Sequence, residues 1–214
     1  MEIISRISAL ILIIFFIPVF LTLSILSLFF QGFPVFFKQD RVGKDFEIFQ
    51  IVKFRTMVLN RGEAITLSND SRVTKWGLML RKLKLDELPQ LLNIIKGDMR
   101  FIGPRPEVLK YFNKNNFNFL KNVKPGISDF SSIILRNENE ILESIGGDRP
   151  YEKLLPIKIK LANYYSNRKS FSLDFKLVLI TIISIFLPDY ASRLLINSEL
   201  RLIVKDLEDI ILKR

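Results

Sequence analysis

Ile7 to Phe30 form a run of 24 residues without a single charged side chain. A straight helix of that length reaches about 36 Å, against roughly 30 Å for the hydrocarbon core of a bilayer. So long an uncharged helix is seldom buried wholly within a domain of the size that 214 residues form. We therefore expect residues 1–32 to be a membrane anchor and residues 33–214 to form one domain outside the membrane.

Pro18 lies near the middle of the anchor. A proline there removes the hydrogen bond to the carbonyl of Ile14 and clashes with that turn, so a kink is expected. Two geometries fit this kink. One is a bent helix that spans the bilayer, and the other is a re-entrant hairpin with two arms of about 11 to 12 residues, each reaching roughly 16 to 18 Å.

Positive charge is distributed unequally around the anchor. Only Arg6 is basic before it, whereas Lys38, Arg41 and Lys44 follow it closely. Basic residues favour the cytoplasmic side of a membrane. With either geometry of the anchor, the domain that follows is expected to face the cytoplasm.

The first part of that domain has a pattern typical of a β-hairpin. Aromatic and β-branched runs at Pro34–Lys38 and Phe46–Phe54 are separated by the turn-forming stretch Arg41–Asp45. Alternation along the second strand would point Lys53 and Arg55 to one face, where they could grip a diphosphate. The alternative for these two side chains is a solvated basic strand edge.

An acidic pair, Asp86 and Glu87, stands just before a predicted helix at Leu88–Lys96. Pro89 suits the first turn of that helix because the missing N–H would be unpaired there, and Gly97 suits its end. The unpaired amides at the start of a helix stabilise negative charge, including that of a phosphate. The alternative is that two acids simply favour a helix start.

Upstream of the acidic pair, turn chemistry at Ser68–Arg72 precedes a predicted basic helix or helical turn at Thr74–Lys84. Arg81 is the first candidate for a phosphate ligand. Lys82 and Lys84 are expected to belong to a solvated face.

A second candidate phosphate ligand lies in the sequence GPRP at 103–106. The two prolines restrict the backbone around Arg105 and reduce the entropy lost when this side chain binds a phosphate. A plain structural turn is the alternative.

The amino-acid composition limits which nucleophiles, metal ligands and partners are possible. The chain contains no cysteine and no histidine, which excludes thiolate nucleophiles, histidine-dependent triads and the usual zinc sites. Any metal would have oxygen ligands, and Mg²⁺ is the expected ion. The net charge of +10 fits phosphorylated substrates, an anionic membrane or nucleic acid. RNA-binding motifs are missing from the sequence, so we expect no nucleic-acid partner.

The C-terminal part reads as mostly helical. Residues 137–150 are polar and glycine-containing, typical of a mobile loop, and Tyr151–Arg168 is a predicted helix whose first turns Pro156 should kink or separate. The apolar run Leu177–Leu187 is too short to cross a bilayer and should lie in the interface or against the anchor, with a core helix as the alternative. Ser192–Lys213 predicts an amphipathic helix.

Three ordered motifs carry a resemblance to a known family. They are PVFFKQDRVGKDFEIFQIVKFRTM at 34–57, SNDSRVTKWGLMLRKLKLDELPQL at 68–91 and KGDMRFIGPRP at 96–106. With the apolar segment before them, they resemble the bacterial sugar transferases, monotopic polyprenyl-phosphate phosphoglycosyl transferases of the minimal single-domain form. The chain departs from the family in having Ile17 before Pro18 where relatives have serine, and PGISDF at 125–130 where many have a PGITGW-like stretch.

The resemblance implies that Asp86 and Glu87 are the catalytic dyad. The implied reaction transfers a sugar 1-phosphate from a UDP-sugar to polyprenyl (undecaprenyl) phosphate and starts a surface glycan such as an exopolysaccharide or lipopolysaccharide. In the mechanism that we infer, Asp86 attacks the β-phosphate, UMP leaves and a phosphosugar-aspartyl enzyme remains. Asp86 and Glu87 are also the candidate Mg²⁺ ligands, and adjacency alone does not divide their roles. The candidate ligands for the substrate phosphates are Lys53, Arg55, Arg81 and Arg105.

These inferences combine into an α+β fold. It has a membrane-inserted helix kinked at Pro18, for which the resemblance favours the re-entrant geometry, a small β-hairpin and a mostly α-helical catalytic domain with interfacial amphipathic helices. The expected place is the bacterial inner (cytoplasmic) membrane, with the catalytic domain on the cytoplasmic face and membrane lipid around the anchor. A homo-oligomer is one option for its assembly. The alternative function is a non-enzymatic basic membrane adaptor that binds polyanionic partners.

Overall fold

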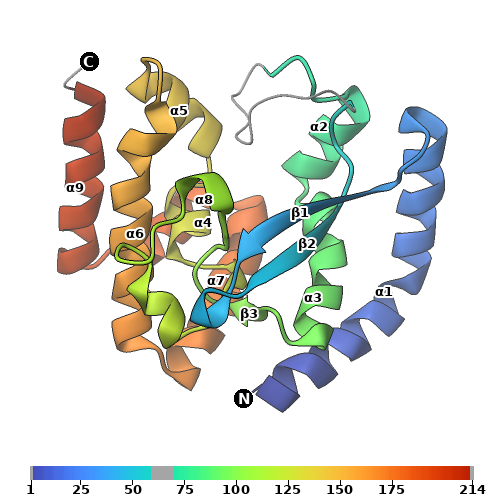
Figure 1. Cartoon of the computed structure of the whole chain (residues 1–214), viewed down its shortest axis with the longest axis horizontal. Coiled ribbons are helices and arrows are strands. Elements are labelled where there is room, and N and C mark those ends of the chain that lie inside the picture. Colours follow the sequence, from blue (N-terminus) through green and yellow to red (C-terminus); the bar gives the residue numbers. More distant parts are fainter. Residues whose placement is uncertain (1, 59–69, 213–214) are drawn as a thin grey trace.

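The computed structural model describes residues 2–58 and 70–212 (Figure 1). Its helices are α1 (Glu2–Gln31), α2 (Lys75–Lys82), α3 (Leu91–Lys96), α4 (Phe130–Ile134), α5 (Glu138–Ile145), α6 (Pro150–Arg168), α7 (Phe171–Phe186), α8 (Pro188–Leu195) and α9 (Ser198–Leu212). Its strands are β1 (Phe36–Val42), β2 (Ile48–Phe54), β3 (Arg100–Ile102), β4 (Glu107–Val108) and β5 (Gly126–Ser128). Four short 3₁₀ helices, η1 (Lys44–Phe46), η2 (Leu85–Gln90), η3 (Leu109–Tyr111) and η4 (Asn118–Lys121), lie between them. The predicted α+β class is confirmed.

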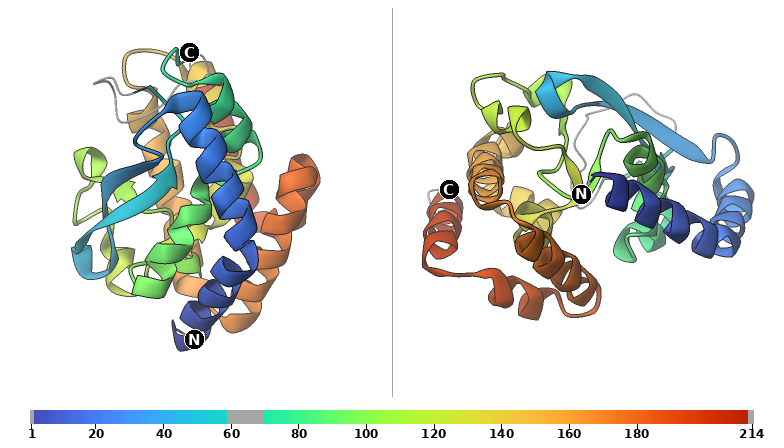
Figure 2. Two further views of the ribbon diagram at one scale, coloured as in Figure 1. Left: turned by 90° about the vertical axis from the view of Figure 1, so that its right-hand side faces the viewer. Right: turned by 90° about the horizontal axis from the view of Figure 1, so that it is seen from below.

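The anchor helix α1 runs without interruption through Pro18 and changes direction about midway along its length (Figures 1 and 2). The predicted kink is therefore a bend and not a break. The hydroxyl of Thr22 donates a 2.8 Å hydrogen bond to the carbonyl of Pro18, one turn back. Hydroxyl bonds of this kind often accompany a bent helix.

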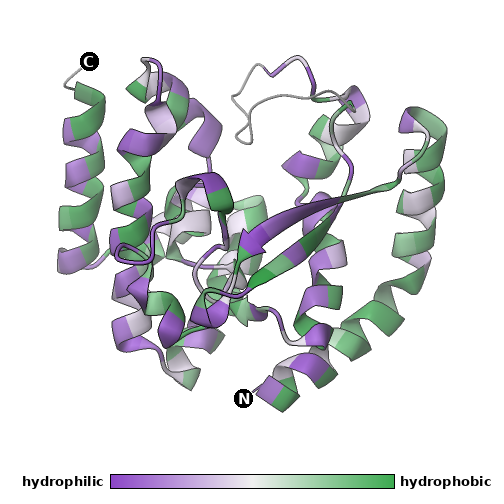
Figure 3. Cartoon of the chain, in the orientation of Figure 1, coloured by the Kyte–Doolittle hydropathy of each residue, from purple (hydrophilic) through white to green (hydrophobic). Residues whose placement is uncertain are grey.

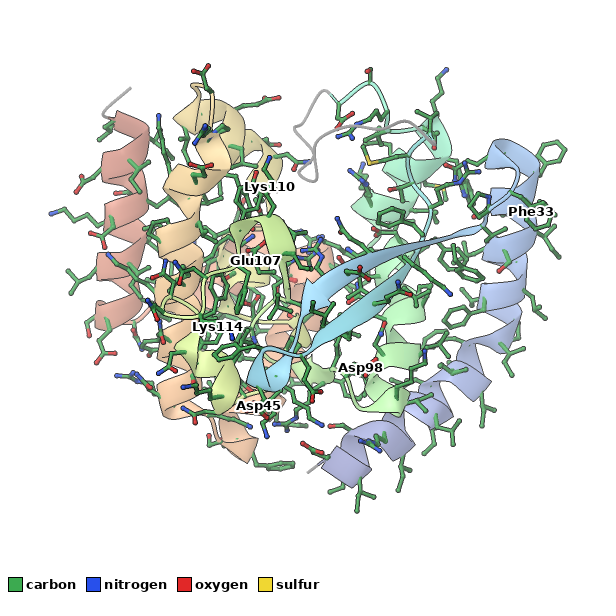
Figure 4. All side chains as sticks on the ribbon, viewed as in Figure 1. Phe33, Asp45, Asp98, Glu107, Lys110 and Lys114 are labelled. Carbon is green, nitrogen blue, oxygen red and sulfur yellow. The ribbon has the colours of Figure 1, made fainter. Side chains whose placement is uncertain are left out.

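Both halves of α1 lie against the domain. In the first half Ala9 is buried against Ile94 and Met99, and in the second half Leu23 is buried against Phe54 and Leu80. The opposite face remains apolar and exposed, and most of the ribbon of α1 has the green colour of hydrophobic residues in Figure 3. Its most exposed large side chains include Ile3, Ile11, Phe15, Ile25 and Phe29. Phe33, 78% exposed, points away from the body at the turn after the helix (Figure 4).

The hairpin is present as predicted. Strands β1 and β2 pair antiparallel from Phe36 opposite Phe54 to Val42 opposite Ile48, and β4 adds to the other side of β1 in the order β2-β1-β4. The first strand continues into the stretch expected as a turn and ends at Val42, and the turn itself is formed by residues 43–47. Strands β3 and β5 form a separate parallel pair.

The main core lies among the C-terminal helices, with α6 beside α4, α5 and α9. The region 137–150, expected as a mobile loop, contains the helix α5. The prediction was wrong because Leu142 and Ile145 recur at helical spacing and are buried, at 0% and 2% exposure, in that core. Polar residues surround these two apolar residues in the sequence, so their helical spacing was not recognised.

Two further helix predictions need correction. Helix α6 is continuous through Pro156, so its first turns are not separate. The helix expected at Ser192–Lys213 is divided into α8 and α9, because the side chain of Asn197 accepts a 2.9 Å hydrogen bond from the backbone N–H of Leu200 and begins a new helix there. The apolar run after Leu177 lies in α7, with one face on the core and the other exposed.

Candidate active site

The acidic pair lies inside a helical turn and not ahead of one. Asp86 and Glu87 belong to the first turn of η2, which continues directly into α3. The predicted helix start at Leu88 is therefore three residues late. The φ angle of Pro89 suits a 3₁₀ turn as well as an α-helix, so the proline does not mark the boundary. Gly97 ends α3 with a φ of 92°, as predicted from its freedom in the left-handed region.

Glu87 is held by two cations. One carboxylate oxygen, Oε1, accepts 2.8 Å contacts from Lys53 Nζ and from Arg105 Nη2. Burial raises the pKa of Glu87, but the positive charges of Arg105 and Lys53 outweigh burial, and the pKa lies well below its usual value. Glu87 is consequently ionised and fixed in place.

Asp86 has the opposite surroundings. Its side chain is as buried as that of Glu87, yet within the described residues its carboxylate accepts no hydrogen bond and forms no ion pair. Burial raises the pKa of Asp86, and the neighbouring charge of Lys53 opposes this rise. A desolvated carboxylate without a partner is available to a ligand or an electrophile.

Arg81 approaches the pair from α2. Thr74 caps this helix by accepting a 2.9 Å hydrogen bond from the backbone N–H of Gly77, as the predicted basic helix requires. Arg81 Nε donates a 2.9 Å hydrogen bond to the hydroxyl of Thr56, immediately after the hairpin. The charge of Arg81 lowers the pKa of Asp86, so the structure brings this predicted phosphate ligand to the dyad. Of the predicted turn before α2, residues 68–69 lie outside the described residues.

The loop at 103–106 is pinned on both sides. The backbone N–H of Arg105 donates to the carboxylate of Asp129, at 3.3 Å, and Gly103 donates to the carbonyl of Ser128, at 3.1 Å. A Cβ atom on Gly103 would lie only 2.3 Å from the carbonyl oxygen of Lys124, so only glycine permits this approach. The side chain of Arg105 is thereby aimed at Glu87, which raises the pKa of the guanidinium.

In the structure, Arg55 does not contact Asp86 or Glu87. Its guanidinium donates to the carbonyl of Gln31 and, at 2.7 Å, to that of Gly32, where α1 ends. Gln31 Nε2 returns a 2.8 Å hydrogen bond to the carbonyl of Arg55. Arg55 is 6% exposed and ties the anchor to the strand that carries Lys53.

Sequence reasoning missed a second polar cluster beside the site. Figure 4 places Glu107 between the end of β1 and the C-terminal helices. Glu107 accepts a 2.6 Å hydrogen bond from the hydroxyl of Tyr151, and Lys158 donates to that hydroxyl and to Glu138, each at 3.0 Å. These four residues come from β4, α5 and α6 and follow no motif, so only the fold reveals them.

Comparison with known proteins decides the family. The bacterial sugar transferase family matches residues 1–188, a span that contains the anchor, the hairpin and every candidate site residue. The chain belongs to that family. This confirms the resemblance carried by the motifs and the expected enzyme class, a sugar-phosphate transferase, and it leaves no support for the non-enzymatic adaptor.

Three relatives illustrate the range of the family. The "Uncharacterized sugar transferase EpsL" of Bacillus subtilis is 38% identical over 71% of this chain and 69% of its own length. The exopolysaccharide production protein ExoY of Rhizobium meliloti is 36% identical over 64% of this chain and 69% of its own. The UDP-N-acetylgalactosamine-undecaprenyl-phosphate N-acetylgalactosaminephosphotransferase of Aeromonas hydrophila is 38% identical over 59% of this chain, which spans only 32% of that longer protein.

Proposed function

We propose that this sugar transferase moves a sugar 1-phosphate from a UDP-sugar to polyprenyl phosphate, specifically undecaprenyl phosphate, and releases UMP. The observation that carries the proposal is the buried carboxylate of Asp86, which has no partner among the described residues and lies beside three basic side chains, those of Lys53, Lys84 and Arg81. The name of the Aeromonas relative supports both the UDP-sugar donor and the undecaprenyl acceptor. The product would start a surface glycan or glycoconjugate.

The reaction divides into two displacements at phosphorus. In the first, an oxygen of Asp86 forms a bond to the β-phosphorus of the donor, the bond from this phosphorus to the bridging oxygen breaks, and UMP leaves with that electron pair. In the second, an oxygen of polyprenyl phosphate attacks the same phosphorus and the carboxylate of Asp86 is regenerated. Each step exchanges one phosphoanhydride or acyl phosphate bond for another, and neither needs an external proton donor.

The contacts of the dyad support a division of the two roles that adjacency left open. Asp86, whose carboxylate has no partner among the described residues, would be the nucleophile. Glu87 is ionised and positions Lys53 and Arg105, so that these two cations face phosphate charge as it develops. Arg81, on α2, would be the third ligand of the substrate phosphates. Arg55 contributes indirectly, by fixing the anchor to the hairpin.

The donor atoms present suit Mg²⁺. Asp86 and Glu87 offer two adjacent carboxylates, which suits an ion that keeps several waters and binds through one or two carboxylates plus substrate phosphates. Asp86 offers unoccupied oxygens, whereas one oxygen of Glu87 is already shared by two cations. Asp86 would therefore be the principal ligand, with Glu87 beside it. Mg²⁺ held there would supply positive charge that neutralises the phosphates.

We place the protein at the bacterial inner membrane with the domain on the cytoplasmic face. Helix α1 is long and apolar enough to cross a bilayer. Both its ends nevertheless touch the polar domain, through the 3.1 Å ion pair of Glu2 with Lys124 and through the contacts of Gln31 with Arg55. A straight span would carry these polar contacts into hydrocarbon, so a shallow, re-entrant insertion bent at Pro18 fits better.

Turnover with defined substrates tests the proposal. The purified full chain in detergent is incubated with undecaprenyl phosphate, Mg²⁺ and each member of a UDP-sugar panel, and UMP and lipid-linked sugar are measured. At least one sugar should give both products in equal amounts. Release of free sugar phosphate without lipid product, or no UMP from any member of the panel, would contradict it.

A further inference from the structure

The side chain of Gln90 is buried without a hydrogen bond for its amide nitrogen. Gln90 is the last residue of η2 and is 2% exposed, and Nε2 has no acceptor in the part of the chain that the structure describes. The three other such nitrogens among the described residues are Nε atoms of arginines that bond through another nitrogen. A buried N–H without an acceptor destabilises a fold, and native proteins pair nearly all such groups. Where one is kept, a catalytic role or a ligand is a common reason.

The neighbours of Gln90 on the same helical face show where its side chain lies. Residues three apart eclipse one another in a 3₁₀ helix and are neighbours on an α-helix, so Glu87, Gln90 and Asn93 form one row along η2 and α3. Glu87 accepts a 2.8 Å contact from Lys53 of β2. The side chain of Asn93 accepts a 3.2 Å hydrogen bond from the backbone N–H of Val52, on the same strand. Gln90 therefore lies against β2, between these two contacts.

Asn93 shows what a structural amide in this row looks like. It is completely buried, and its Nδ2 donates to the carbonyl of Gln50, at 2.7 Å, and to the carboxylate of Asp98, at 3.2 Å. The fold thus supplies acceptors for the amide of Asn93 and, within the described residues, none for the amide of Gln90 one turn earlier. The two amides differ in position, because Gln90 is the one that adjoins the dyad.

The side chain of Gln90 leans toward the dyad. The Cα–Cβ bonds of a helix tilt toward its N-terminus, so a side chain covers the turn before its own. For Gln90 that turn carries Asp86 and Glu87, four and three residues earlier. Glu87 is already held by two cations, whereas the carboxylate of Asp86 has no partner among the described residues. An N–H group at this position can therefore meet a group that becomes bonded to Asp86.

We propose that Gln90 donates a hydrogen bond to the phosphoryl group while this group is bonded to Asp86. This inference rests on the proposed function and deepens it. Because Nε2 is covered in the free protein, a UDP-sugar held by the cations of the site does not reach it, and the contact forms only as the bond to Asp86 draws the phosphorus toward η2. An interaction made only during the chemical steps raises kcat without tightening substrate binding.

Two variants of the full chain remove the N–H donor. Gln90→Met keeps the length of the side chain without its polar atoms, and Gln90→Glu keeps its shape but replaces the NH₂ group by an oxygen. Gln90→Met should raise the melting temperature, because a buried amide without an acceptor is removed. It should lower kcat about 10²-fold and leave both KM values within about threefold of the parent. Gln90→Glu should lose at least as much kcat, whereas the matched control Gln50→Met, exposed on β2, should stay within about twofold of the parent.

The rate at which the covalent intermediate forms tests the contact most closely. In a rapid-quench reaction with UDP-sugar and Mg²⁺ but no lipid, the sugar phosphate should appear on Asp86 about 10²-fold more slowly in Gln90→Met than in the parent. An equal rate, as expected of an amide that pairs only with buried water, would overturn this inference while the parent still supports the proposed function. A parent that never turns over would contradict the proposed function itself. A rise in KM without a loss of kcat, or a lower melting temperature of Gln90→Met, would also overturn the inference.

Discussion

Two charge clusters lie side by side in this transferase, and they differ in whether every charged group has a partner. In the cluster of Glu107, Glu138, Tyr151 and Lys158, every member contacts another within 3.0 Å. In the cluster around the dyad, Glu87 has two cationic partners while Asp86 has none among the described residues.

The same difference is seen in the pKa values of Lys158, in the first cluster, and Lys53, in the second. Burial lowers the pKa of Lys158, but Glu138, Tyr151 and Glu107 together outweigh burial, and the pKa lies above its usual value. Burial also lowers the pKa of Lys53, and here Glu87 does not compensate fully. The first cluster is electrostatically complete and stabilises the fold. The second is incomplete without a ligand, as expected where phosphate groups are to bind.

Substitution of the unpaired carboxylate should separate activity from stability. Asp86→Asn removes the nucleophile and should lower kcat by about 10³-fold or more, which steady-state UMP release would measure. The melting temperature at pH 7 should rise, because a buried charge without a partner among the described residues is lost. An Asp86→Asn protein that is inactive because it is unfolded would break the comparison.

Substitution in the cluster around Lys158 should have the opposite effect, lowering stability and leaving activity nearly unchanged. Lys158→Met leaves Glu138 and the hydroxyl of Tyr151 without a donor and should cost about 2 kcal/mol of unfolding free energy, less than a fully buried pair because Glu138 is partly exposed. Chemical denaturation would measure this loss. The folded fraction should retain activity within a few fold, and a loss of activity comparable to that of Asp86→Asn would show that this cluster takes part in the chemistry.

Arg55 gives a smaller test of how the anchor relates to the site. Arg55→Lys keeps the positive charge but cannot bond both carbonyls at the end of α1 in the same way, so kcat should fall about three- to tenfold. KM for the UDP-sugar should not change, since Arg55 does not contact the dyad. A selective rise in that KM would restore Arg55 as a phosphate ligand.

The smallest expected effect is a pH dependence of stability. The pKa of Asp86 is higher in the folded than in the unfolded chain, so ionised Asp86 destabilises the fold above the folded pKa, and this cost disappears below the unfolded value near 3.9. Asp86→Asn should therefore exceed the parent in melting temperature at pH 7, and the difference should shrink as the pH falls toward 4. A difference that grows on acidification would contradict the raised pKa.

The sequence was sufficient for local features and motifs. The anchor, the hairpin, the capped helix before Arg81 and the end of α3 at Gly97 all follow from short-range patterns. The partners of Asp86 and Glu87 do not, because Lys53 and Arg105 reach Glu87 only after the hairpin and the pinned loop have folded. Helix α5 was also not predictable from local patterns, because its apolar residues are recognisable as core residues only once the core is known. The contacts of Arg55 were not predictable either, because they depend on where α1 ends.

The most direct test of the central claim is intact-protein mass spectrometry of the full chain mixed with a UDP-sugar and Mg²⁺ in the absence of lipid. The account predicts an added mass of one sugar phosphate that maps to the Asp86 peptide, disappears when undecaprenyl phosphate is added and is absent from the Asp86→Asn variant. A chain that turns over with both substrates yet never gains this mass, or gains it equally in Asp86→Asn, would contradict the account.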